Sequence, residues 1–185
     1  MKRGLKMTKD AELFINKALE IGFETAKEID TGTLAVRKDV REMCAADKCH
    51  AFGKNWTCPP ACGELSECSE RIKKYKHGII VQTTGKTEKS IDTKAYRRIE
   101  ALHHDRFVGL TAFVRATHPE ALCLGAGGCR ICKVCTYPNA PCRFPDKSYS
   151  SMEAYGLFVT QVCRDNGINY YYGEKTMTYT SCILF

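Results

Sequence analysis

The sequence predicts an α+β (α/β) protein in which a single mixed sheet, flanked by helices, carries two cysteine-rich metal-binding loops. Three observations predict this class. Helical and strand patterns follow one another irregularly along 185 residues. The length is typical of one domain, so we expect residues 1–185 to form a single metal-binding domain. Ten of the 12 cysteines fall into two loops, over residues 44–68 and 123–145.

The first half of the chain contains the patterns of two helices and two strands. Residues 9–21 repeat apolar side chains at helical spacing, and Gly22 marks the end of that helix. Residues 33–37 are expected to form a short strand, and residues 64–76 a second helix. The β-branched run over residues 78–84 is the clearest strand, closed by a glycine.

The second half of the chain begins with a long helix over residues 92–117, which Asp92 starts. The spacing of Ser150 and Glu153 matches a capping box and predicts a helix that continues to about Asn166. The last elements are expected to be the two strands of a hairpin, over residues 168–172 and 176–184.

The N-terminus indicates the compartment. Met1–Met7 carries charge but is followed by no apolar stretch, which disfavours secretion. No apolar run approaches the ~18 residues that a membrane span needs. We therefore expect a cytoplasmic protein without membrane attachment, in which 12 cysteines indicate metal or redox chemistry instead of disulfides.

The second loop contains the strongest motif. Cys129, Cys132 and Cys135 form a C-x2-C-x2-C run, and Cys142 follows after a turn. Bacterial ferredoxins use such a run to hold a [4Fe-4S] cluster, although their fourth cysteine comes sooner. Zinc is the alternative, but structural zinc usually takes two separated cysteine pairs. The spacing favours a [4Fe-4S] cluster over zinc.

The first loop predicts a second centre with less certainty about its ligands. Its candidate ligands are Cys44, Cys49, Cys58 and Cys62. These gaps match no ferredoxin pattern, and Cys68 is a fifth thiol nearby. Three ligands would leave one iron open to substrate, whereas four would make an electron carrier. Zinc or structural thiols are the alternatives here.

The formal charge of +7 has two interpretations. It could attract nucleic acid or another anion. A [4Fe-4S] core with four thiolates carries about −2, so two such units would lower the charge to about +3. Basic residues near the cysteines could also raise a reduction potential or dock an anionic redox partner. We favour this second interpretation.

Several motifs together resemble a known family. They are Cys49–Pro60, Gly127–Cys135, Pro141–Pro145 and Ser151–Gly156. In this order they resemble the uncharacterised, cysteine-rich "predicted metal-binding protein" family, a domain of unknown function common in anaerobic bacteria and archaea. The resemblance covers about residues 10–185. It implies metal binding of the iron–sulfur type in a cytoplasmic protein of anaerobic metabolism, and it implies no particular reaction.

The leading hypothesis is an iron–sulfur protein that passes electrons to an anaerobic redox partner protein. One alternative is an enzyme whose three-cysteine cluster has an open iron that binds substrate in a reduction or in sulfur chemistry. Another is a zinc-stabilised interaction or RNA-binding module, although we do not expect nucleic acid as the partner. The sequence is compatible with an enzyme or a carrier, and with a monomer or a homodimer. Trp56 is expected to pack over the first loop.

Overall fold

A computed structural model describes residues 8–185. The stretch Met1–Met7, for which we expect no secretion signal, lies outside the described residues.

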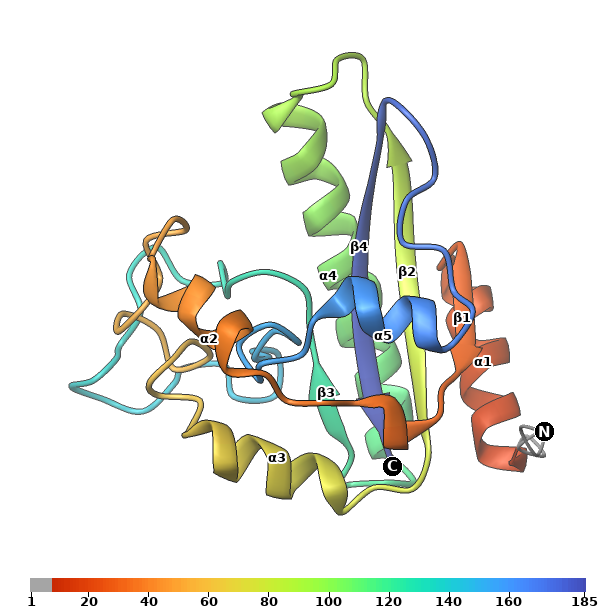
Figure 1. The fold of residues 1–185 in the computed structure, drawn as a ribbon, viewed down its shortest axis with the longest axis horizontal. Helices are drawn as coiled ribbons and strands as arrows, with labels where there is room; N and C mark the ends of the chain where they lie inside the picture. The colour runs from red at the N-terminus through yellow and green to blue at the C-terminus, as the bar shows by residue number, and fades with distance from the viewer. Residues whose placement is uncertain (1–7) are drawn as a thin grey trace.

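One antiparallel sheet of four strands, in the order β1-β2-β4-β3, forms the centre of the described chain (Figure 1). The strands are β1 (Thr25–Glu28), β2 (Gly78–Lys86), β3 (Leu122–Leu124) and β4 (Thr176–Leu184). The two long strands pair over their full length, from Gly78 opposite Leu184 to Lys86 opposite Thr176. The α+β class and the single sheet are confirmed, while every pairing is antiparallel instead of mixed.

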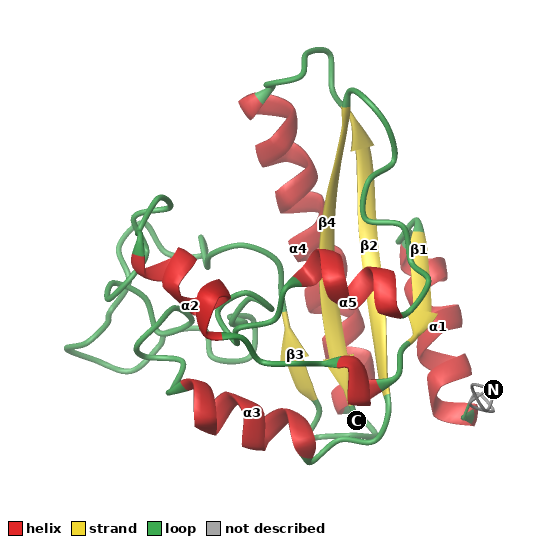
Figure 2. Cartoon of the chain, in the orientation of Figure 1, coloured by secondary structure: helices red, strands yellow, loops and turns green. Residues whose placement is uncertain are grey.

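The helices lie around this sheet (Figure 2). They are α1 (Lys9–Ile21), α2 (Lys38–Ala45), α3 (Leu65–Lys73), α4 (Thr93–Arg115) and α5 (Val159–Asp165), with a 3₁₀ turn at Thr31–Thr33. Figure 1 shows α4 and α5 on opposite sides of the sheet, and the cysteine-rich loops gathered beyond β3. The edge of the sheet at β3 therefore positions both loops.

The strands bury side chains on both faces, because successive side chains point to opposite sides of a strand. On β2, Ile79 and Val81 pack with α1 and α4 in one apolar cluster. Ile80, between them, packs with α3 and α5 in a second cluster. Two apolar cores thus hold helices on both faces, which explains why the sequence of β2 is apolar without alternation.

The helices with clear local signals begin and end where the sequence predicts. Gly22 ends α1 with a φ of 109°, and its N–H is bonded to the carbonyls of Ala18 and Leu19. Asp92 caps α4 by accepting a hydrogen bond from the N–H of Ala95. The predicted helix over residues 64–76 is confirmed in position but ends at Lys73.

Two predicted strands are wrong. Residues 33–37 form no strand, and Val36 makes one isolated bridge with Leu157. Residues 168–172 do not pair either. The edge strand β1 was missed because its sequence Thr-Ala-Lys-Glu lacks the apolar alternation of a strand.

The predicted helix over residues 150–166 is also wrong in its first half. Ser151 Oγ, and not Ser150, accepts from the N–H of Ala154 at 3.0 Å, and the chain then turns. Gly156 has a φ of 77°, which interrupts any helix there, so α5 begins only at Val159.

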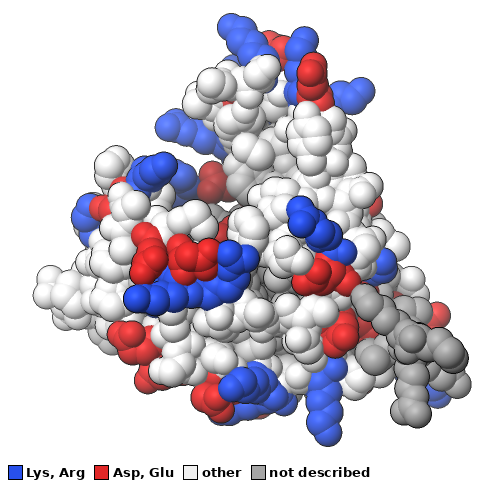
Figure 3. Space-filling model, viewed as in Figure 1, with Lys and Arg blue, Asp and Glu red and all other residues white. Residues whose placement is uncertain are grey.

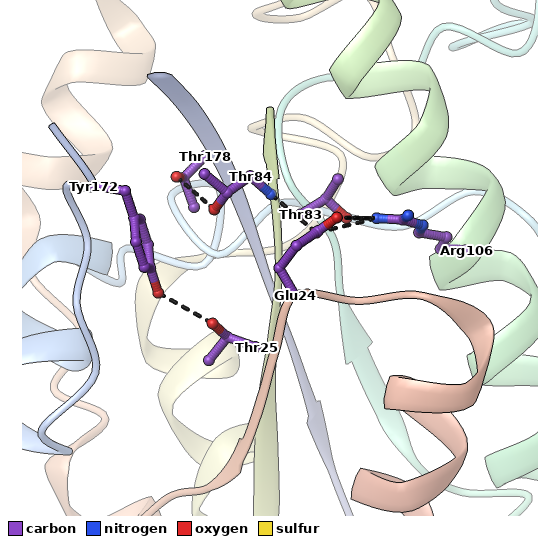
Figure 4. Close-up of polar contacts among 7 residues, drawn as sticks. All are labelled: Glu24, Thr25, Thr83, Thr84, Arg106, Tyr172 and Thr178. Atoms are coloured by element: carbon purple, nitrogen blue, oxygen red, sulfur yellow. Dashed lines mark hydrogen bonds and ion pairs between the residues drawn. The ribbon is translucent and has the colours of Figure 1, made fainter. Parts of the chain in front are cut away.

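A set of polar contacts shows why residues 168–172 need no strand pairing (Figure 4). The Tyr172 hydroxyl lies 3.1 Å from Thr25 Oγ1 and donates to Gln82 Oε1 at 2.7 Å. On the other side of β2, Arg106 of α4 donates to Glu24 at 3.1 Å and to Thr83 Oγ1 at 3.2 Å. Side chains therefore attach both this segment and α4 to the sheet.

A buried histidine of α4 makes the stability depend on pH. His103 is 2% exposed, and its Nε2 lies 2.7 Å from Ser181 Oγ. Burial, together with Arg106 and His104, lowers its pKa from 6.5 to about 3. Between pH 6.5 and about 3 the unfolded chain therefore binds one more proton than the folded protein. The free energy of unfolding thus decreases as the pH is lowered through that window.

We expect the free energy of unfolding to fall by about 2 kcal/mol between pH 7 and pH 5 because of this residue alone. Urea unfolding of the wild type and of His103→Gln at both pH values measures the difference, and other titrating groups cancel in the comparison. An equal pH dependence in the two proteins would contradict this assignment.

Candidate metal centres

Four of the five cysteines of the second loop line one cavity. Cys129, Cys132, Cys135 and Cys142 all line it, and it has an empty volume of about 360 Å³, which includes space open to solvent. Burial raises the pKa of the Cys129 thiol, and the thiols of Cys142, Cys132 and Cys135 raise it further. Thiols that oppose the ionisation of one another in this way are suited to a cation, which releases their protons on binding.

Hydrogen bonds fix the loop that carries this set, which we call the second cysteine set. At its start, the N–H of Gly125 donates to the Ser150 carbonyl at 2.8 Å. At its end, the N–H of Phe144 and the hydroxyl of Ser148 each lie 3.4 Å from Cys142 Sγ. The positions of these thiols are thus held by the backbone and not by sequence spacing alone.

Three thiols of the first loop lie near enough to influence the pKa values of Cys44 and Cys58. Cys44 lies near the end of α2, and Cys49 and Cys58 lie in the irregular loop that follows. Burial raises the pKa of the Cys58 thiol most, and Cys49 and Cys44 raise it further. Burial also raises the pKa of the Cys44 thiol most, and Glu153 and Cys49 raise it further. We call these three residues the first cysteine set.

Cys62 and Cys68 form a pair that adjoins the first set, since Cys58 also raises the pKa of the Cys62 thiol. Cys62 Sγ lies 3.6 Å from the Ala154 carbonyl, and Arg41 Nη2 lies 3.4 Å from Cys68 Sγ. A hydrogen bond from Cys62 and the Arg41 guanidinium lower the pKa of Cys68, while the same bond and burial raise that of Cys62. The sequence predicts Cys62 as a fourth ligand, and this stays a prediction.

The segment between the two sets joins them. Asn55, Trp56 and Thr57 line the cavity of the second set, and Cys58 of the first set is the next residue. Trp56 Nε1 donates to the Ala140 carbonyl at 3.0 Å, and its ring meets Tyr137 edge to face at 5.0 Å. Trp56, which we expected over the first loop, therefore closes the second set. The two thiol sets are neighbours.

The remaining three cysteines belong to the core. Cys123, Cys163 and Cys182 are at most 5% exposed and lie in β3, α5 and β4. Burial raises the pKa of Cys123 and of Cys163 to about 11. Within residues 8–185, no three His, Cys, Asp or Glu side chains are grouped as ligands of a single metal ion.

Sequence reasoning missed two charged residues beside the first set. Arg41 lies three residues before Cys44, which places both on one face of α2, and this spacing could have revealed it. Glu153 has no such signal, because only the fold brings it to Cys44, whose Sγ lies 3.9 Å from the Glu153 carbonyl. Burial raises the pKa of the Glu153 carboxyl.

The α+β fold and its two neighbouring thiol sets together define a cysteine-rich protein suited to metal binding. The chain belongs to the family described as predicted metal-binding protein (DUF2284), whose family model matches residues 27–185. The family that the sequence motifs resemble is thereby confirmed. Neither the curated proteins nor the solved structures gave a match to this chain. Among the described residues, none of the helices combines the length and the apolar character needed to cross a membrane.

Proposed function

We propose that this metal-binding protein is an iron–sulfur electron carrier. Cys129, Cys132, Cys135 and Cys142 would hold a [4Fe-4S] cluster. Cys44, Cys49 and Cys58 would hold a second centre, with Cys62 as its fourth ligand. The observation that carries the proposal is that the three cysteines of the C-x2-C-x2-C run and the downstream Cys142 line one cavity.

The donor chemistry fits such a cluster. The second cysteine set offers four thiols and no carboxylate or imidazole in the lining of its cavity. Cysteine thiolates in this run are the usual ligands of iron–sulfur clusters, whereas structural zinc takes separated pairs. When bound, such a cluster accepts and donates single electrons.

The arrangement of the two sets supports a role in electron transfer. Because Asn55–Thr57 and Cys58 are consecutive, the chain itself connects the two sets. Trp56 covers the cavity of the second set and reduces its contact with water, which influences the reduction potential of a cluster. An anaerobic redox partner would supply or receive the electrons.

Anaerobic purification followed by iron and acid-labile sulfide analysis tests the proposal. We expect about eight irons per chain for two clusters and a broad absorbance near ~400 nm. About one equivalent of zinc, with no iron or sulfide, would instead support the zinc-stabilised module and contradict the proposal.

An enzyme with an open iron is the second candidate, and the first cysteine set favours it. The Cys62 thiol donates to the Ala154 carbonyl at 3.6 Å, and the Cys68 thiol donates to the Cys62 carbonyl at 3.9 Å. Three thiolates alone would leave one iron of a cluster available to a substrate.

Substituting single ligands distinguishes the two candidates. If the first centre has three ligands, we expect Cys62→Ser to keep the iron of both centres and Cys58→Ser to lose about four irons per chain. Iron analysis and electron paramagnetic resonance of the reduced proteins measure this. Equal losses in the two variants would support four ligands and the electron carrier.

A further inference from the structure

The second cysteine set has an outer face as well as an inner cavity. Its outer face is an open basin with an empty volume of about 1110 Å³, solvent included. Three of its four cysteines line this basin, and the loop of the first set lines the other side with His50, Lys54 and Asn55. This face therefore gives another molecule access to three cysteines of the second set.

Basic side chains predominate on this face. Lys54, Arg130 and Lys133 line the basin and no carboxylate does, while Arg130 is paired with Glu100 at 3.1 Å. Lys133 is exposed and has no ion pair within 4.0 Å among the described residues. Lys54 is 61% exposed at its side chain and makes only a 3.5 Å contact with Asp47.

An exposed apolar side chain lies among these charges. Val134 is 76% exposed, next to Lys133 and Cys135, and it lines the basin. Arg143 Nη1 donates to the Val134 carbonyl at 3.1 Å, which fixes this part of the loop. An apolar centre with a charged rim is the usual composition of small, transient interfaces, including those of electron-transfer proteins.

We propose that this face docks an acidic protein that carries single electrons. The proposal rests on the proposed iron–sulfur function and adds the docking surface and the charge of the partner. Opposite charges on the two proteins would steer the encounter, and Val134, which lines the basin together with Cys132 and Cys135, would form the apolar centre of the contact.

The same basic charge could attract nucleic acid, but the aromatic residues of this face argue against it. Single-stranded nucleic acid binds by stacking bases on exposed aromatic rings. Tyr137 is the aromatic residue that lines this basin, and its ring instead meets Trp56 edge to face at 5.0 Å. Figure 3 shows basic and acidic side chains interspersed over the side of the molecule that it draws, so that side offers no continuous basic area of the kind that nucleic-acid binding uses.

The experiment uses the anaerobically purified, iron-loaded protein with a reduced acidic [2Fe–2S] ferredoxin as probe. Stopped-flow absorbance gives the rate of electron transfer at increasing salt. We expect the rate at low salt to fall at least ~10-fold in Lys133→Glu, and to fall also in Lys54→Gln, which lies outside the cysteine run. Lys89→Glu is the matched control, because Lys89 is exposed in the loop between β2 and α4, away from the cysteine loops (Figure 1).

The salt dependence separates docking from a change in reduction potential. A docking defect disappears at high salt, where charges are screened, whereas a shifted potential persists. The docking proposal is overturned if iron-loaded Lys133→Glu and Lys89→Glu react at the same rate. It is also overturned if a basic cytochrome c reacts as fast as the ferredoxin at low salt. A third contrary outcome is that Lys133→Glu weakens the binding of a single-stranded RNA and leaves the rate with the ferredoxin unchanged. A wild type without iron and sulfide would overturn the proposed function, and this docking proposal with it.

Discussion

Replacing Cys132 by serine should remove one whole cluster and leave the other in place. Cys132 lies in the middle of the C-x2-C-x2-C run and lines the shared cavity. A serine hydroxyl is a poor ligand for iron at neutral pH, since thiolates are the ligands that hold these clusters. We expect the iron content to fall by about four per chain, with a matching loss of sulfide and of absorbance near ~400 nm.

Cys163→Ala is the matched control for this prediction. Cys163 is fully buried against the sheet in α5 and lines neither the cavity nor the basin of the second set. Its truncation should lower stability by ~1 kcal/mol through lost packing while the iron content stays constant. Circular dichroism verifies that both variants are folded. Unchanged iron in Cys132→Ser, or an equal loss in both variants, would show that the second set does not hold a cluster.

The sequence predicted the elements whose signals are local. Helix α1 carries an apolar stripe and a terminal glycine, and α4 carries its own aspartate cap, so both were predicted within two residues. Strand β1 carries no such signal, because its position follows from pairing with β2. Helix α5 (Val159–Asp165) lies within the predicted helix, but the turn at Gly156 removes the first part of the predicted one.

The same distinction applies to the candidate site. The second cysteine set was predicted as a group because its three central members are separated by fixed, short spacings, and the structure places all four around one cavity. The first loop has longer spacings, and its division into three thiols and a Cys62–Cys68 pair depends on contacts with Ala154 and Arg41. These contacts join segments far apart in sequence, so spacing alone could not predict them.

Replacing Gly156 by alanine should be the most destabilising glycine substitution near the first cysteine set. Gly156 has a φ of 77°, and an added Cβ would lie 2.7 Å from Leu65 Cδ2 and 3.1 Å from the Arg37 carbonyl. Backbone strain costs ~1–2 kcal/mol and overpacking another ~1–3 kcal/mol, so we expect a loss of about 2–5 kcal/mol. Urea unfolding under anaerobic conditions measures it.

This substitution should also affect the metal sites unequally, which distinguishes it from a general loss of stability. The Gly156 carbonyl accepts from the N–H of Arg37 at 2.8 Å, directly before α2, which carries Arg41 and Cys44. A displaced α2 would move Cys44 away from the first set but would leave the second loop in place, so we expect iron to be lost from the first centre alone.

Gly173→Ala is the control, because Gly173 also has a positive φ of 104° but has nothing within 4 Å of its added Cβ. It should show the backbone strain without the clash and should keep all of its iron. If Gly156→Ala costs no more stability than Gly173→Ala, the contacts with Leu65 and Arg37 do not hold the first cysteine set in position.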